Sequence, residues 1–191
     1  MREFLKDFEE RVGQDWKHLS VQTTSSGTRC IGQVPEVGKA AWLHRFYSGC
    51  PAAELDAVEQ NIGQPIAPQW REALEYINGA SLFLRKISLR GVLPGNLVRR
   101  SIEDPQPLSF QDANTIQRPS GNATAADDLV IGGSSIGSGA LYLLRSDGSV
   151  LKCTRDGRQA LASWETVQAM LESEYKTLAA LHDAHGVYHP T

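Results

Sequence analysis

A glycine- and serine-rich stretch, Gly132–Gly139, is the part of the sequence most suggestive of chemistry. Backbone N–H groups in such a loop can cradle a phosphate. The phosphate loop of nucleotide hydrolases ends in Gly-Lys followed by Ser or Thr, however, and this stretch has no lysine. A dinucleotide-binding loop opens a helix, whereas residues 140–144 predict a strand. We therefore interpret the stretch, with Gly132 and Gly133 at its start, as a turn between strands and expect no cofactor.

The same stretch contains the pattern Gly-x-Ser-x-Gly, with Ser135 at its centre. In the nucleophile elbow of a hydrolase, the serine follows a strand and precedes a helix. Residues 129–131 predict the strand, but the residues after the turn predict no helix. The pattern therefore favours a structural turn over a nucleophilic serine.

Histidines gather near the C-terminal end, at His182, His185 and His189. Their spacing could bring imidazoles together around a metal ion. Gly186 and Pro190 interrupt helical geometry in this segment, and chain ends are usually poorly ordered. We expect no metal site here.

The cysteines and the apolar pattern bear on the compartment. Cys30, Cys50 and Cys153 are odd in number and far apart, which suits a reducing environment better than a set of disulfides. Charges are frequent among residues 1–21, so no signal peptide is expected, and no apolar run approaches the ~20 residues of a membrane span. These features predict a cytoplasmic protein without a membrane partner.

Charge is distributed unevenly along the chain. The formal net charge is −3, whereas nucleic-acid-binding domains are usually basic, so we expect no nucleic-acid partner. A basic stretch comprises Arg85, Lys86, Arg90, Arg99 and Arg100, and it follows an acidic one that comprises Glu54, Asp56, Glu59, Glu72 and Glu75. The two sets either pair as ordinary salt bridges or form separate surfaces that attract a partner.

The spacing of apolar residues predicts helices first and strands later. Helices are expected over residues 1–19, 36–47, 51–62, 68–77 and 161–181, with a helical turn within 108–116 and a loop over 20–35. Strands are expected over 81–84, 87–92, 129–131, 140–144 and 149–152. Asn78 and Gly79 are expected to end a helix, and Asp147 and Gly148 to form a hairpin turn, because these residue types favour such turns. This order predicts an α+β fold with a mostly antiparallel sheet.

The order of several motifs resembles the SUKH superfamily. The motifs are a helix ending in Ile62-Gly63, the element Ile66-Ala67-Pro68, a second helix followed by Asn78-Gly79, the strand–turn–strand–hairpin region Asp127–Cys153, and Ser163-Trp164 with Val167 at the last helix. The resemblance covers residues 50–182. Residues 1–49 are expected to form a helical N-terminal extension and residues 183–191 a tail.

The resemblance implies N-terminal helices packed on a curved sheet, and a function without catalysis. Bacterial members of the superfamily are mainly thought to bind and neutralise polymorphic toxins, often nucleases, and fungal relatives act as regulatory scaffolds. The first role is our leading hypothesis and the second is the alternative; an enzyme that uses Ser135 is a third. Against a basic nuclease site, the acidic surface would be the useful one. Trp70, Tyr76 and Arg90 are our candidates for partner contacts.

Overall fold

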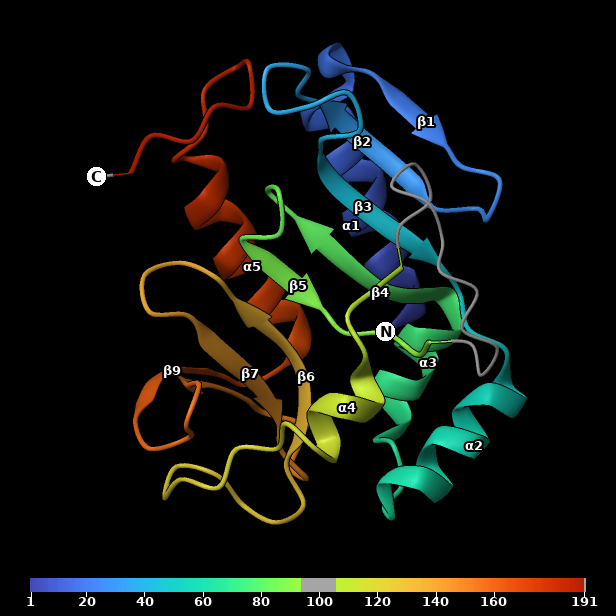
Figure 1. The fold of residues 1–191 in the computed structure, drawn as a ribbon, viewed down its shortest axis with the longest axis vertical. Helices are drawn as coiled ribbons and strands as arrows, with labels where there is room; N and C mark the ends of the chain where they lie inside the picture. The colour runs from blue at the N-terminus through green and yellow to red at the C-terminus, as the bar shows by residue number, and fades with distance from the viewer. Residues whose placement is uncertain (94–105, 191) are drawn as a thin grey trace.

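The computed structural model describes residues 1–93 and 106–190, which form an α+β fold around a nine-stranded antiparallel sheet (Figure 1). The strands lie in the sheet in the order of the sequence, from β1 to β9. The elements are α1 (Arg2–Asp15), the short 3-10 helix η1 (Lys17–Leu19), β1 (Val21–Thr23), β2 (Arg29–Gln33), β3 (Trp42–Ser48), α2 (Ala52–Ile62), α3 (Pro68–Tyr76), β4 (Ile77–Leu82), β5 (Ile87–Leu89), α4 (Phe110–Asn114), β6 (Leu129–Ser134), β7 (Ala140–Leu144), β8 (Val150–Thr154), β9 (Ala160–Trp164) and α5 (Val167–Ala179). None of the helices in the described residues has the length and apolar character that a membrane span requires.

The main core lies between the sheet and the helices α1 and α5, which pass behind the sheet in Figure 1. In α1, Leu5, Phe8 and Val12 recur at helical spacing and are buried together, as the sequence predicted. In α5, Met170, Leu171 and Leu178 repeat the pattern. The apolar stripe of each helix therefore packs on the sheet.

A second, smaller core lies on the opposite face of the sheet. Val130, Leu143 and Leu151 come from β6, β7 and β8, and Ala113 of α4 packs on them. We call this the α4 face. The buried Asn114 side chain fixes α4 to β6, since its Oδ1 accepts from the Val130 N–H at 2.8 Å.

Residues 20–49 differ from the prediction. The expected loop over 20–35 holds β1 and β2, and the expected helix over 36–47 is wrong, because residues 42–48 form β3. Five of the seven residues of β3 are buried, so the strand lacks the alternation of apolar and polar residues that reveals a strand. Residues 1–49 are therefore not simply a helical extension: β3 pairs with β4 in the common sheet.

The C-terminal helix is shorter than predicted. Residues 160–164 form the edge strand β9, so Trp164 lies on a strand. The helix begins at Val167, and Thr166 is its N-cap, with a side chain that accepts from the Ala169 N–H at 3.1 Å. The predicted hairpin turn is confirmed: Gly148 has φ +87°, and Asp147 accepts from the Ser149 N–H at 2.9 Å.

Asn78 and Gly79 lie inside β4 instead of ending a helix, because α3 passes directly into the strand at Ile77. Only Gly79 is left-handed, with φ +82°, and a Cβ there would lie 2.7 Å from the Leu89 carbonyl oxygen. The Asn78 side chain donates to the Val92 carbonyl oxygen at 2.8 Å and accepts from its N–H at 2.6 Å. The amide group thus extends the pairing of β4 past the end of β5.

Replacing Gly79 should destabilise the protein more than replacing a glycine that meets no steric barrier. Gly63 is also left-handed, at φ +72°, but a Cβ there meets nothing within 4 Å. We expect Gly63→Ala to cost about 1 kcal/mol of unfolding free energy and Gly79→Ala at least about 2 kcal/mol, as measured by urea denaturation. Equal losses would show that the close approach to Leu89 carries no cost.

His44 lies in an aromatic cluster behind the sheet. It is fully buried, its two ring nitrogens have no hydrogen-bond partner among the described residues, and Trp16, Phe83, Tyr175 and His182 surround it. Burial, with a smaller effect from His182, lowers the pKa of His44 from 6.5 to about 3. The imidazole is therefore neutral in the folded protein across the physiological pH range.

Stability should fall as the solution becomes acidic. Between pH 6.5 and pH 3 the unfolded chain binds a proton at His44 that the folded chain does not. The contribution of His44 to the unfolding free energy is therefore complete above pH 6.5 and declines below it. We expect up to about 1.4 kcal/mol of lost unfolding free energy per pH unit from this group. Urea denaturation between pH 7 and pH 5 should show a shallower decline for His44→Leu than for the wild type, and an unchanged one for the exposed His185→Leu. An unchanged slope for His44→Leu would contradict the assignment.

Candidate binding site

Strand register places small side chains next to one another on the α4 face. Ser81 of β4 lies opposite Ser88 of β5, which lies opposite Gly133 of β6, which lies opposite Leu141 of β7. Directly opposed residues share a face of the sheet, and Leu141 packs on the α4-face core. The sheet therefore has little side-chain bulk on this face across β4 to β6.

A hollow of about 280 Å³ lies over this region, and we call it the arginine hollow. It is lined by Leu84, Arg85, Ser88, Leu108, Gly133, Ser134, Ser135, Ala140, Leu141 and Arg155. Its lining contains two guanidinium groups and no carboxylate. Neither arginine forms an ion pair with a carboxylate in the described part of the chain.

Arg85 is positioned by an unusual turn between β4 and β5. Phe83, Leu84 and Arg85 have φ of +51°, +54° and +70°, a left-handed conformation that costs side-chain-bearing residues about 1–2 kcal/mol each. Phe83 is fully buried, and the Leu84 N–H donates to the Leu43 carbonyl oxygen at 2.9 Å. Burial of the aromatic ring therefore holds the turn that carries Arg85.

The glycine-rich stretch supports both arginines. The Ser135 hydroxyl donates to the Arg85 carbonyl oxygen at 3.2 Å, and the Ser135 N–H donates to the Lys86 carbonyl oxygen at 3.0 Å. A Cβ at Gly139, which has φ +80°, would lie 2.5 Å from Arg155 Nε. The prediction of a turn between strands is confirmed, although Gly132 and Gly133 belong to β6. The turn positions side chains from two other parts of the chain.

The same contacts bear on the chemistry considered for this stretch. β7, a strand, follows the turn, so the helix of a nucleophile elbow is missing from these residues. The N–H groups of Ser135, Ile136 and Gly139 already donate within the protein, which leaves them unavailable to a phosphate. The geometry favours recognition by the two arginine side chains.

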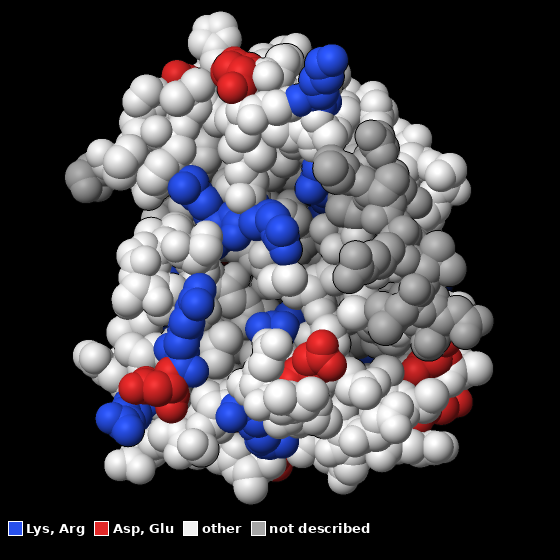
Figure 2. All heavy atoms as spheres, viewed as in Figure 1, with Lys and Arg blue, Asp and Glu red and all other residues white. Residues whose placement is uncertain are grey.

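The sheet side and the helices differ in charge. Figure 2 shows Lys and Arg side chains across the middle of the face that is turned toward the viewer, and Asp and Glu side chains at its top and in its lower half. On α2 and α3, by contrast, Arg71 lies 2.6 Å from Asp56, 3.0 Å from Glu59 and 3.6 Å from Glu75. Three members of the acidic set thus share one cation, Arg71, and Glu72 pairs with the amino group of Met1. Arg99 and Arg100 of the basic stretch lie outside the described residues.

The three residues predicted to contact a partner do not form one surface. Trp70 is in the main core, with 2% of its surface exposed, and a partner cannot reach it in this structure. Trp70 begins the buried stripe of α3, which continues with Ala73 and Leu74, and this explains its burial. Tyr76 donates to Glu9 of α1 at 3.3 Å, whereas Arg90 donates to the Ser109 carbonyl oxygen near α4 at 3.0 Å. The sequence did not predict that Arg85 and Arg155 line one site.

The C-terminal histidines are separated by the fold. His182 is buried and its Nδ1 donates to the Leu178 carbonyl oxygen at 2.7 Å, whereas His189 is exposed and contacts Asp183 at 2.9 Å. Within residues 1–93 and 106–190, His, Cys, Asp and Glu side chains form no group suited to a metal ion.

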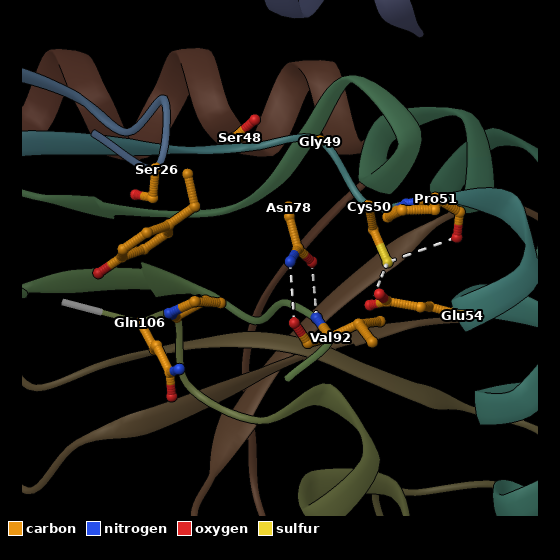
Figure 3. A pocket seen from close by; sticks show the side chains of 11 residues that line it. Ser26, Ser48, Gly49, Cys50, Pro51, Glu54, Asn78, Val92 and Gln106 are labelled. Atoms are coloured by element: carbon orange, nitrogen blue, oxygen red, sulfur yellow. Dashed lines mark hydrogen bonds between the residues drawn. The ribbon is translucent and has the colours of Figure 1, made fainter. Parts of the chain in front are cut away.

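A smaller hollow of about 170 Å³ lies beside β3 and α2. In Figure 3 the Cys50 thiol points toward the Glu54 carboxylate, and the two are 3.7 Å apart. Burial and the Glu54 charge raise the pKa of Cys50 to about 12. Cys50 is therefore a protonated thiol at neutral pH and a poor nucleophile.

Alkylation should reveal the protonated state of this thiol. We expect iodoacetamide at pH 7.5 to modify Cys50 in the folded protein at least ~100-fold more slowly than in the urea-unfolded chain, as followed by mass spectrometry. Glu54→Gln removes a charge that raises the pKa, so it should accelerate modification of Cys50 several-fold. Cys153, whose pKa burial raises to about 11, is the internal control and should not respond. An unaltered Cys50 rate in Glu54→Gln would contradict the role of the carboxylate.

No protein-family model matches the chain, and no curated protein matches it. The resemblance to the SUKH superfamily therefore rests on the order of motifs in residues 50–182. What the arginine hollow binds must be inferred from its lining and its charge.

Proposed function

We propose that this chain is a non-catalytic binding protein that holds an acidic surface of a protein partner on the α4 face of its sheet. The observation that carries the proposal is the arginine hollow, where Arg85 and Arg155 line one space without a carboxylate. Guanidinium groups bind carboxylates through paired, charge-assisted hydrogen bonds. Because neither arginine has a carboxylate partner among the described residues, a carboxylate from another molecule would not have to break an ion pair that the structure describes.

The distribution of ion pairs favours the basic surface over the acidic one as the contact. Asp56, Glu59 and Glu75 already have a cationic partner in Arg71. A partner that competed for them would have to break existing pairs. Unpaired charges steer association and reject partners of the same sign. The partner therefore presents carboxylates, and the acidic helices serve the fold.

The resemblance to the SUKH superfamily supports a toxin domain as the partner. The motifs that carry the resemblance lie within residues 50–182. In this role the chain covers the catalytic site of the toxin or holds the toxin inactive. Neither step requires chemistry from this chain.

Charge reversal at the hollow should abolish capture of the partner. The tagged protein is used as bait in lysates of the cells that produce it, beside Arg85→Glu/Arg155→Glu and the matched double variant Arg158→Glu/Lys176→Glu. The control makes the same charge change at two exposed residues that do not line the hollow. We expect the partner to be retained by the wild type and the control and reduced at least tenfold with the hollow variant, because two charge pairs are lost.

The captured domain is then expressed alone and with this chain. An immunity role predicts that the domain arrests growth and that co-expression of the wild type, but not of the hollow variant, restores it. Equal capture by all three baits would refute the basic face as the contact. A partner that is harmless to cells would refute the immunity role.

A further inference from the structure

The lining of the arginine hollow is largely apolar beneath its charged rim. Leu84, Leu108, Ala140 and Leu141 contribute carbon surface, and Leu108 is 38% exposed. Gly133 must stay small, since a Cβ there would lie 2.8 Å from the Ala140 carbonyl oxygen. Binding of an apolar side chain is favourable here, because it removes water from apolar surface on both molecules.

The two arginines enter the hollow from opposite sides. Arg85 comes from the turn that precedes β5, and Arg155 follows β8, so the hollow lies over the strands between them. The backbones that carry the two arginines are three strand spacings apart, roughly 14 Å, and the Arg155 side chain extends over Gly139 into this span. In an extended chain, residues i−2 and i+2 lie on the same side as residue i and are separated by roughly 13 Å.

From these observations we infer that the hollow binds an extended acidic segment with an acid–x–apolar–x–acid pattern, in which the apolar side chain enters the hollow and the flanking carboxylates pair with Arg85 and Arg155. The inference rests on the proposed function and specifies the part of the partner that is recognised. A phosphate fits the lining less well, because the apolar floor would stay exposed and the N–H groups of Ser135 and Gly139 donate internally. A phosphate-containing ligand is therefore an outcome of the test.

The probe is an acetylated, amidated peptide with the sequence Gly-Glu-Ser-Phe-Ser-Glu-Gly. Binding is measured on the full chain from amide shifts in two-dimensional NMR spectra. We expect saturable shifts at Ser88, Gly133 and Leu141, and an affinity at least tenfold lower when Phe is replaced by Gly or both Glu by Gln. Arg85→Glu/Arg155→Glu should lose binding, whereas Arg158→Glu/Lys176→Glu should keep it. The spectrum of each free variant shows whether it is folded.

Several results would overturn the inference. These are the absence of shifts at millimolar peptide, equal affinity of the peptide without Phe, or competition by inorganic phosphate at a concentration similar to that of the peptide. If the peptide fails while the captured partner still requires Arg85 and Arg155, the proposed function stands and this pattern is wrong. If neither the peptide nor any partner requires the two arginines, both are refuted.

Discussion

Burial of Phe83 holds the turn between β4 and β5, and the arginine hollow depends on that turn. Three consecutive side-chain-bearing residues are left-handed there, a conformation that a free chain avoids. The ring of Phe83 lies 4.6 Å from that of His44 and 5.4 Å from that of Tyr175, so the main core opposes the strain. The direction of Arg85 on one face of the sheet is thereby linked to packing on the other face. Loss of the aromatic cluster would release the turn.

The two faces of the sheet differ in the size of the side chains that they carry. On the α1 and α5 side, large apolar residues fill the space, and even a histidine is kept neutral in the interior. On the α4 face, the register brings Ser81, Ser88 and Gly133 together, and α4 covers only the part over β6 to β8. In the described part of the chain, Ser88 and Gly133 line the arginine hollow beside the part of this face on which α4 packs.

The sequence predicts the parts of the fold where one local signal is sufficient. The hairpin at Gly148 is such a case, because its turn requires a positive φ, and α2 is another, because Gly63 ends it. The strand β3 escapes prediction, since burial on both sides removes the alternation of apolar and polar residues. The sequence predicts even less of the candidate site. No local pattern marks Phe83 as left-handed, and Arg85 and Arg155 meet only through the order of the strands.

The glycine-rich stretch is a turn between two strands, as the sequence predicted, and its composition has a structural reason. Its residues are small because neighbouring groups approach closely: Gly133 faces the Ala140 carbonyl group, and Gly139 faces the guanidinium of Arg155. The requirement for glycine is therefore steric. In the proposed function, binding rests on the side chains of Arg85 and Arg155, which come from other segments, and the residues that line the hollow include no carboxylate. On α2 and α3, by contrast, three acidic residues form ion pairs with Arg71. Among the described residues, the acids of α2 and α3 share an ion-pair partner and the two arginines of the hollow have none, so the proposed acidic partner would add charge-assisted hydrogen bonds at the hollow.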